Sequence, residues 1–338
     1  PLPFVDRTLD YTFPRDGDSY RILWDEDGLF PVDLDAMPVA LGQKRQFFID
    51  DYLIAAAHNI GYTVHQPRKH EANPLVLPDR PWEGRRGSII GPVIRDPDSG
   101  RLRMWYRTHQ GRFPLAAGRM AKEALLYATS EDGLEWTKPE LGIYPWEGSA
   151  ANNILGAEMQ LHSLFCEPDE PDPTRRYKGL MVTRQPRAGA KGFFNLATSP
   201  DGLQWTKHPE AIGLMSSRAQ DGYRGRQQGL GDTNSLLFDE PLGRYIWHSK
   251  VFVGGKRARA MLESDDLHHW TPPRVVLCAD ALDAPDTQLY DMHPLPYESL
   301  WIAPLRVYRW RQFKQVEIQL AHSRDGRHYA RSADRQVF

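Results

Sequence analysis

One short segment recurs four times along this chain of 338 residues, and it constrains the fold more than any other feature. Residues 127–138 (YATSEDGLEWTK) are repeated at 196–207 (LATSPDGLQWTK), 262–271 (LESDDLHHWT) and 321–329 (AHSRDGRHY). The aromatic residue of the repeat recurs at intervals of roughly 60 to 70 residues, which suits a four-stranded propeller blade with long loops. Asp-Gly supplies the positive φ of a tight turn, and the aromatic side chain packs on a neighbouring sheet.

A second apolar hairpin precedes each copy of the repeat. The clearest spans residues 88–106, where a PDSG turn at 97–100 separates two apolar strands, and residues 162–182, 234–247 and 288–303 follow the same pattern. The 10 Trp, 14 Tyr and 13 Phe favour strands over helices, and 27 Gly and 27 Pro supply the turns that short strands need. The sequence therefore predicts four blades, each with two strands from the hairpin and two from the repeat.

A fifth blade is expected from segments outside these four modules. Residues 46–54 (QFFIDDYLI) and 61–65 (GYTVH) are predicted to form another hairpin, which would join the C-terminal residues and close the ring. We therefore expect an all-β fold, a five-bladed β-propeller that forms a single catalytic domain over residues 46–338. Residues 1–45 are expected to be an N-terminal extension that packs on it. An open β-solenoid or a sandwich is the alternative fold, although the period is long for either.

Several short motifs carry a family resemblance. Residues 47–54 (FFIDDYLI), 73–74 (NP), 81–84 (PWEG), 104–106 (MWY) and the D-G-L-x-W turns together resemble the five-bladed propeller glycosidases of glycosyl hydrolase families 32, 43 and 68. The resemblance spans most of residues 46–332. It implies hydrolysis of furanosides and related sugars by carboxylates that project into a funnel at one end of the central channel.

The chain departs from that family pattern at the catalytic motifs. It has no Asn-Asp-Pro-Asn-Gly-type nucleophile motif. Arg95-Asp96-Pro97 matches the Arg-Asp-Pro stabiliser of invertases, but it opens the turn between the first two strands of a blade. Because such turns lie on the face opposite the funnel, we expect a structural role for this motif.

Propeller topology selects the candidate catalytic residues. The starts of the first strands, the loops between second and third strands and the crossovers between blades all face the funnel. Glycoside hydrolysis generally needs two carboxyls, one to protonate the leaving oxygen and one as nucleophile or water-activating base. The acids that meet the criterion are Asp232, Glu83, Asp291, Asp51 and Asp286. The sequence does not show which acid is the proton donor, whether configuration is retained or whether cleavage is exo or endo. The alternative is that these acids have a structural role and cap turns.

Basic residues gather in the loops expected between second and third strands, at 106–124, 183–192, 250–259 and 306–315. These loops contain a single acid, Glu123, and their basic residues include Arg259 and Arg306. A positive rim of this kind favours a uronate-bearing, sulfated or otherwise anionic glycan, although exposed loops are often charged. The predicted substrate-binding residues are His162, Arg107, Arg184, Lys250, Arg257, Arg309, Trp82 and His293.

Bulk properties exclude some classes of function. The net charge of −2 gives no case for nucleic acid binding, and no apolar run approaches the roughly 18 residues that span a membrane. Cys166 and Cys278 fit neither a disulfide framework nor a metal knuckle, although a single bridge stays open. We expect no required cofactor and no metal-ligating residues, with a Ca²⁺ ion in the channel left open.

The compartment and the oligomeric state are not readable from the sequence. The chain starts at Pro1 with neither an initiator Met nor a signal-like apolar segment, as would a chain that has lost a leader or been trimmed. We expect a secreted or periplasmic location.

These observations favour a glycoside hydrolase that acts on an oligo- or polysaccharide. Two alternatives stay open. One is a propeller that binds glycans or proteins without catalysis, and the other is a polysaccharide lyase that uses a His/Tyr or Arg pair on uronate glycans.

Overall fold

The computed structural model describes residues 14–15, 18–19, 41–54, 57–61, 63, 65–84, 88–108, 111–183, 192–215, 230–309, 315–332 and 335–338. The chain divides into two compact units, Pro1–Gly61 and Tyr62–Phe338. In the first unit, the described strands are the short pair β1 (Pro14–Arg15) and β2 (Asp18–Ser19). The described residues contain short 3-10 turns but no α-helix, so the predicted all-β class is confirmed for them.

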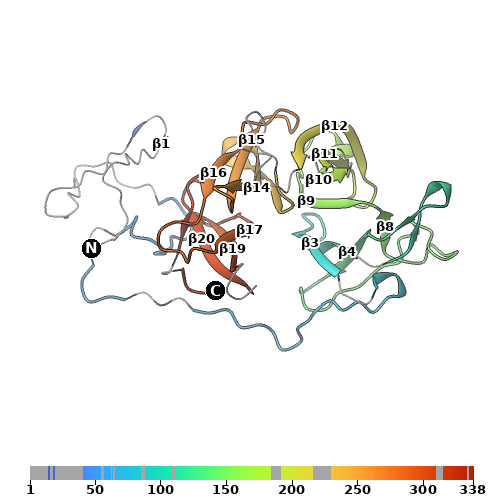
Figure 1. Ribbon diagram of the computed structural model, residues 1–338, viewed down its shortest axis with the longest axis horizontal. Helices are drawn as coiled ribbons and strands as arrows, with labels where there is room; N and C mark the ends of the chain where they lie inside the picture. The colour runs from blue at the N-terminus through green and yellow to red at the C-terminus, as the bar shows by residue number, and fades with distance from the viewer. Residues whose placement is uncertain are drawn as a thin grey trace. The chain divides into compact units, whose positions relative to one another are not determined.

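Four antiparallel sheets follow one another in the described part of the second unit, and we call them blades I to IV (Figure 1). Blade I consists of β3 (Ser88–Arg95), β4 (Leu102–Thr108), β7 (Ala124–Ser130) and β8 (Ile154–Ala157). Blade II consists of β9 (Gln160–Cys166), β10 (Tyr177–Thr183), β11 (Gly192–Ser199) and β12 (Thr206–Met215). A short hairpin of β5 (Phe113–Pro114) and β6 (Met120–Ala121) leaves blade I.

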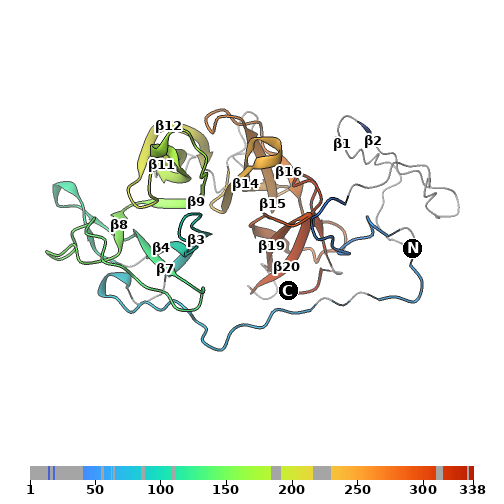
Figure 2. The same cartoon turned by 180° about the vertical axis from the view of Figure 1, so that it is seen from behind.

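Blades III and IV are also antiparallel sheets of strands that follow one another in the sequence, and Figure 2 shows them from behind in orange and red. Blade III consists of β13 (Asn234–Asp239), β14 (Arg244–Val253), β15 (Lys256–Ser264) and β16 (Arg274–Leu277). Blade IV consists of β17 (Thr287–Met292), β18 (Leu295–Tyr297), β19 (Leu300–Arg309), β20 (Gln315–Ser323) and β21 (Ala330–Arg331), with β17 and β18 both paired to β19. The four predicted hairpins therefore supply the first two strands of the blades, and the repeats supply the end of the third strand and the turn after it. The fourth strand does not always come from the repeat as expected, because β8 and β16 begin after the repeats at 127–138 and 262–271.

The repeat builds the same turn in every blade. In blade II, one carboxylate oxygen of Asp201 accepts the N–H groups of Leu203 at 2.8 Å and Gln204 at 2.9 Å. The hydroxyl of Ser199 accepts the N–H of Gly202 at 2.8 Å, and the indole of Trp205 donates to the Gly202 carbonyl at 2.9 Å. Asp132, Asp266 and Asp325 accept the corresponding pairs of N–H groups in the other blades. The recurring residues are therefore those that satisfy the backbone of the turn.

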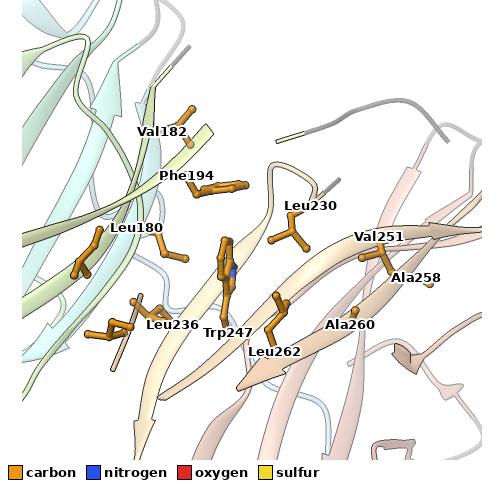
Figure 3. Packing of buried hydrophobic residues seen from close by; sticks show 12 residues of the cluster. Leu180, Val182, Phe194, Leu230, Leu236, Trp247, Val251, Ala258, Ala260 and Leu262 are labelled. Atoms are coloured by element: carbon orange, nitrogen blue, oxygen red, sulfur yellow. The ribbon is translucent and has the colours of Figure 1, made fainter. Parts of the chain in front are cut away.

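Apolar clusters join each blade to the next. Between blades II and III, the fully buried Trp247 lies 5.0 Å from the ring of Phe194, and Figure 3 shows it among Leu180, Leu236 and Leu262. The corresponding clusters centre on Trp105 between blades I and II and on Leu289 and Trp301 between blades III and IV. Burial of these large side chains between sheets fixes the order of the blades.

The first strands of the blades lie side by side, β3 by β9, β9 by β13 and β13 by β17. Among these strands, β3, β9 and β17 each have one extra residue relative to their partner, at 91–92, at His162 and at Tyr290. In β3 the bulge requires Gly91, because an added Cβ would lie 2.4 Å from the Trp105 carbonyl oxygen. Such bulges turn side chains in new directions and are frequent beside active sites.

The hairpin predicted for the fifth blade is not present in the described residues of 46–54 and 61–65. Residues 49–53 form bends and a turn, and the other described residues of these segments have no regular secondary structure. The cause is local, because Asp50 accepts the N–H of Tyr52 at 3.3 Å and the Ile54 N–H bonds the Asp51 carbonyl at 2.9 Å. These bonds offer the backbone an alternative to a strand ladder. Four blades are therefore evident, and the fifth is not confirmed.

Candidate active site

Asp232 lies directly before β13, in a segment that is fastened to β14. The N–H of Gly231 donates to the carbonyl of Lys250 at 2.7 Å, and the N–H of Lys250 donates to the Thr233 carbonyl at 3.2 Å. The ammonium of Lys250 binds the Asp232 carboxylate, whose side chain stays 50% exposed, whereas that of Lys250 is 6% exposed. The carboxylate is thus held by a buried cation and still faces solvent.

The surroundings of Asp232 keep it charged. Burial acts to raise the pKa of Asp232, but the charge and hydrogen bond of Lys250, with a smaller contribution from His162, lower it below its ordinary value. Burial lowers the pKa of Lys250, although Asp232 opposes this effect. An aspartate with a lowered pKa is ionised at neutral pH, so Asp232 can act as a base or nucleophile but not as a proton donor.

His162 reaches the same place from blade II. It is the extra residue in the bulge of β9, and its Nδ1 lies 3.1 Å from the carbonyl oxygen of Asp232. The ring stands edge-on to Phe194, with 5.9 Å between their centroids. Two residues selected separately from the sequence, His162 and Asp232, are therefore in contact.

Arg259, on β15, is fully buried and connects blade III to blade IV. Its guanidinium donates to the Thr233 hydroxyl at 2.8 Å, to the Thr233 carbonyl at 3.2 Å and to the Tyr290 carbonyl at 3.2 Å. No carboxylate of the described residues lies within ion-pair distance of it, although Asp291 and Asp232 both favour its charge from further away. Burial lowers its pKa to about 10.

Asp291, on β17, is buried and fully engaged. One oxygen lies 3.0 Å from Nε2 of His293 and 3.6 Å from the guanidinium of Arg306, and the other accepts the N–H of Met292 at 3.0 Å. Burial acts to raise the pKa of Asp291, but His293, Arg259 and Arg306 lower it to about 2. The side chains of His293 and Arg306 are each half exposed, so the buried carboxylate holds two groups that face solvent.

Cationic side chains of blade III make cation–π contacts with aromatic rings of blade IV. The ring centre of Tyr290 lies 4.6 Å from the Lys250 ammonium and 5.4 Å from the Arg257 guanidinium. Arg257 also lies 5.8 Å from the ring centre of Tyr308 and donates to the Gln288 side chain. We call the whole group the Asp232–Asp291 cluster; its members are His162, Asp232, Thr233, Lys250, Arg257, Arg259, Tyr290, Asp291, His293 and Arg306.

Glu83 lies elsewhere, in a network on the face of blade I that is turned away from blade II. Its buried carboxylate accepts from the Tyr106 hydroxyl at 2.8 Å, from the Lys138 ammonium at 2.7 Å and from the Arg80 N–H at 2.9 Å. Its neighbour Trp82 donates to the Asn153 side chain at 2.7 Å. None of these hydrogen-bond and ion-pair partners of Glu83 and Trp82 belongs to the Asp232–Asp291 cluster. The contacts hold the segment that enters blade I against the blade.

The other predicted site residues are scattered. Asp51 is exposed in the first unit, Asp286 is half-buried before β17, and Arg107 is half-buried on β4. Arg309 pairs with Glu317 at 3.1 Å and donates to the Thr287 hydroxyl. Arg184 lies outside the described residues, as do the neighbouring residues of its loop.

Asp96 forms the turn that the sequence indicates. One of its oxygens accepts the N–H groups of Asp98 and Ser99, and the other lies 3.0 Å from the Arg103 guanidinium and 3.1 Å from the Tyr177 hydroxyl. The Arg-Asp-Pro motif thus links a turn of blade I to blade II.

Two features of the cluster differ from the sequence-based expectation. Residues 250–259 are a hairpin of β14 and β15 rather than a loop, with Gly254 and Gly255 at its turn. Tyr290 and Thr233 were not among the candidate site residues predicted from the sequence. Neither the bulge at Tyr290 nor the hydrogen bonds from Arg259 to Thr233 can be recognised from a sequence pattern.

The described residues contain neither a candidate metal centre nor a disulfide. No group of three or more His, Cys, Asp or Glu residues there could hold a metal ion. Within the same part of the chain, no helix is long and apolar enough to cross a membrane. The half-buried Cys166 and the exposed Cys278 are free thiols, so the bridge left open by the sequence is not formed.

No family model and no curated protein matches the chain. Similar solved structures include an N-acetylgalactosamine deacetylase from F. plautii in complex with blood group B trisaccharide, with 15% identity over 72% of this chain and 68% of that chain and a TM-score of 0.47. A thermostable family-43 glycoside hydrolase has 11% identity over 72% of each chain and a TM-score of 0.48. A family 117 glycoside hydrolase produced by the marine bacterium Zobellia galactanivorans has 14% identity over 73% of this chain and 69% of that chain and a TM-score of 0.45.

These structures include the family-43 type of propeller enzyme that the sequence motifs resemble. At such identities and TM-scores they transfer no residue's role to this chain.

Proposed function

We propose that the protein is a glycoside hydrolase whose active site is the Asp232–Asp291 cluster. The observation that supports this most strongly is the position of Arg259. It binds Thr233, the residue after Asp232, and Tyr290, the residue before Asp291. One buried guanidinium therefore joins the two segments that carry the ionised carboxylates of neighbouring blades. Glycoside hydrolysis uses two carboxyl-bearing groups around one bond, so this is the part of the described chain best suited to it.

Asp232 is proposed as the nucleophile or as the base that activates water, the two roles open to an ionised carboxylate in this chemistry. Its lowered pKa keeps it unprotonated at neutral pH, and half of its side chain is accessible to a ligand. Its position before β13 puts it beside the bulges of β9 and β17, which supply His162 and Tyr290.

The proton donor is proposed to be His293, held by Asp291. With a pKa of about 2, Asp291 is itself ionised and cannot deliver a proton at neutral pH. A protonated imidazole beside this carboxylate could donate its proton to the leaving oxygen as the glycosidic C–O bond breaks, and could later recover a proton from water. The second carboxyl of the expected pair would then act through the histidine.

The proposal of an anionic substrate is supported by the charges of the cluster. Its described cations Lys250, Arg257, Arg259 and Arg306 outnumber the carboxylates Asp232 and Asp291. Arg259 in particular is buried without a direct ion pair, and a buried charge is stabilised by an opposite charge nearby. A glycan that carries carboxylate or sulfate groups would supply that charge, and the half-exposed Arg306 offers a planar donor fork to it. We therefore propose a uronate-bearing or sulfated glycan.

The test is incubation of the purified protein with neutral, uronate-bearing and sulfated oligosaccharides. New reducing ends without unsaturated sugars would support the proposal. Unsaturated products would indicate a lyase instead. Saturable binding without any product from the whole panel would indicate a glycan-binding propeller.

A further inference from the structure

Lys250 was expected to bind substrate, but its geometry indicates another role. Its side chain is 6% exposed, and the ammonium is enclosed by the Asp232 carboxylate and by the face of Tyr290, whose ring centre is 4.6 Å away. An ammonium covered in this way offers little surface to a glycan. It is a partner of Asp232, and not of a ligand.

The segment before β13 is shaped to admit this lysine. A Cβ on Gly231 would lie 2.5 Å from Cε and 2.8 Å from Cβ of Lys250, so any side chain there would displace the lysine. The φ of Gly231 does not require glycine, because it lies outside the left-handed region. The absence of a side chain at Gly231 is therefore explained by the close approach of Lys250 alone.

We propose that Lys250 is a positioning residue that fixes the orientation and the charge of Asp232, and that Gly231 provides the space for it. The inference rests on the proposed function in that Asp232 is taken as a catalytic residue. The side chain and both backbone groups of Lys250 bind the segment 231–233, so one residue of β14 sets where the carboxylate lies.

Other charged groups face Asp232 as well. His162 of β9 makes a smaller contribution that stabilises the ionised form of Asp232. Arg259 of β15 carries a positive charge near Asp232. Two further titratable groups on this side, Tyr290 and Asp291, belong to β17. Of these groups, Lys250 makes the direct ion pair and has the largest stabilising effect on the charged carboxylate. Removal of Lys250 should therefore raise the pKa of Asp232 even though Arg259 remains.

The test is a Lys250→Met variant studied in two ways. The first is titration of the Asp232 carboxyl by NMR of carboxyl-labelled protein, in which the signal is assigned by its loss in Asp232→Asn. The second is the pH profile of kcat/KM on whichever glycan the wild type cleaves. We expect the Asp232 titration and the acidic limb of the profile to move together to higher pH. We also expect kcat to fall on the order of 100-fold, because displacement of a reacting group by about 1 Å can cost that much, while KM changes little.

Two further variants and one control make the result specific. Lys250→Arg keeps the positive charge and should return the acidic limb towards the wild-type pH. Gly231→Ala should shift the limb in the same direction as Lys250→Met, because it displaces the lysine. Lys207→Met is the matched control, since Lys207 donates to the Thr183 hydroxyl on blade II and belongs to no part of the cluster. It should leave the Asp232 titration unchanged.

Circular dichroism and thermal unfolding show whether each variant is folded. Should Lys250→Met not fold, Gly231→Ala and Lys250→Arg carry the same comparison. An Asp232 titration that does not move in the folded variants would overturn the inference. A shifted titration together with an Asp232→Asn enzyme of full activity would leave the role of Lys250 intact and would refute the proposed role of Asp232.

Discussion

The imidazole of His293 lies 3.0 Å from the buried carboxylate of Asp291, and Arg306 approaches the same oxygen at 3.6 Å from the paired strand. One buried charge thus orients two half-exposed groups of different chemistry. Imidazole is the side chain that most often serves as a general acid or base, whereas a guanidinium is suited to binding planar anions. Each group can be tested separately.

Replacement of His293 by Gln should remove the proton donor. We expect kcat on a natural glycan to fall by about 10²- to 10⁴-fold, the usual range for loss of a general acid. An aryl glycoside with a good leaving group needs no protonation and should be cleaved at nearly the wild-type rate. His269→Gln is the control, because His269 lies in an exposed turn of blade III. Equal losses on both substrates would argue against His293 as the donor.

Replacement of Arg306 by Gln should weaken the recognition of anionic substrates. We expect KM to rise by about 10-fold or more for a uronate-bearing oligosaccharide, and much less for a neutral analogue of the same length, since a charged hydrogen bond contributes about 1.5–3 kcal/mol. Arg309→Gln is the control, because Arg309 is already paired with Glu317. A similar rise in KM for the neutral substrate would contradict an anion-binding role.

Glu83 should matter for stability and not for catalysis. Its carboxylate is buried against the Lys138 ammonium, and removal of one partner from a buried ion pair costs on the order of 3 kcal/mol. Glu83→Gln should therefore lower the denaturant midpoint and leave kcat unchanged. Glu131→Gln, which removes an exposed partner of Arg101, should change neither quantity. A large fall in kcat in folded Glu83→Gln would show that Glu83 belongs to the active site after all.

The contribution of the repeat turn to stability can be tested by comparing substitutions of two adjacent aspartates, Asp265 and Asp266. Asp266 accepts the N–H groups of His268 and His269, whereas Asp265 forms an exposed pair with Arg244. Asp266→Ala should lower the free energy of unfolding by about 1 kcal/mol, as does loss of a helix-capping side chain, and Asp265→Ala should change it by less than about 0.5 kcal/mol. Equal effects in chemical denaturation would show that the turn bonds contribute nothing.

The effect of Asp266→Ala should also depend on pH. The side-chain hydrogen bond of His269, with the N–H groups of the turn and the Ser264 hydroxyl, lowers the pKa of Asp266 from its ordinary value of 3.8. A carboxyl with a lowered folded-state pKa stabilises the fold above the pKa of the unfolded chain and loses this contribution as the pH falls through the folded-state pKa. The difference in unfolding free energy between variant and wild type should therefore shrink below pH 3.8. Asp266 in turn raises the pKa of His269 above 6.5, so the difference should also become smaller as the pH rises past the folded-state pKa of His269.

The sequence was sufficient for most of the fold because the turns repeat. Each Ser-x-Asp sequence bonds its own backbone, so its structure depends on residues within a few positions, and the four blades could be counted from it. The same reasoning failed at residues 46–54, where apolar residues indicate a strand but Asp50 forms a local turn. Strand pairing depends on a partner far away in the chain, which a single segment does not reveal.

The candidate site could be predicted only in part. Asp232 follows from the rule that strand starts face the funnel. Asp291 and His293 were selected by the same rule, but β17 begins at Thr287, so Asp291 lies near the end of that strand and His293 beyond it. Arg259 joins the segments of Asp232 and Asp291. The same rule also selected Glu83, because sequence position does not show that Tyr106 and Lys138 enclose it. The bulge at Tyr290 and the burial of Lys250 depend on tertiary structure and could not be predicted. The bulge adds Tyr290 to the cluster, and the burial makes Lys250 a partner of Asp232 instead of a substrate-binding residue.

The most direct test of the account compares wild type with Asp232→Asn on the glycan that the wild type cleaves. The account predicts new reducing ends from the wild type and a loss on the order of 10³-fold or more in Asp232→Asn. The variant should also unfold at a lower temperature, because the buried Lys250 ammonium loses its charged partner, so activities are compared well below both unfolding midpoints. Retention of wild-type activity in the folded Asp232→Asn protein would contradict it.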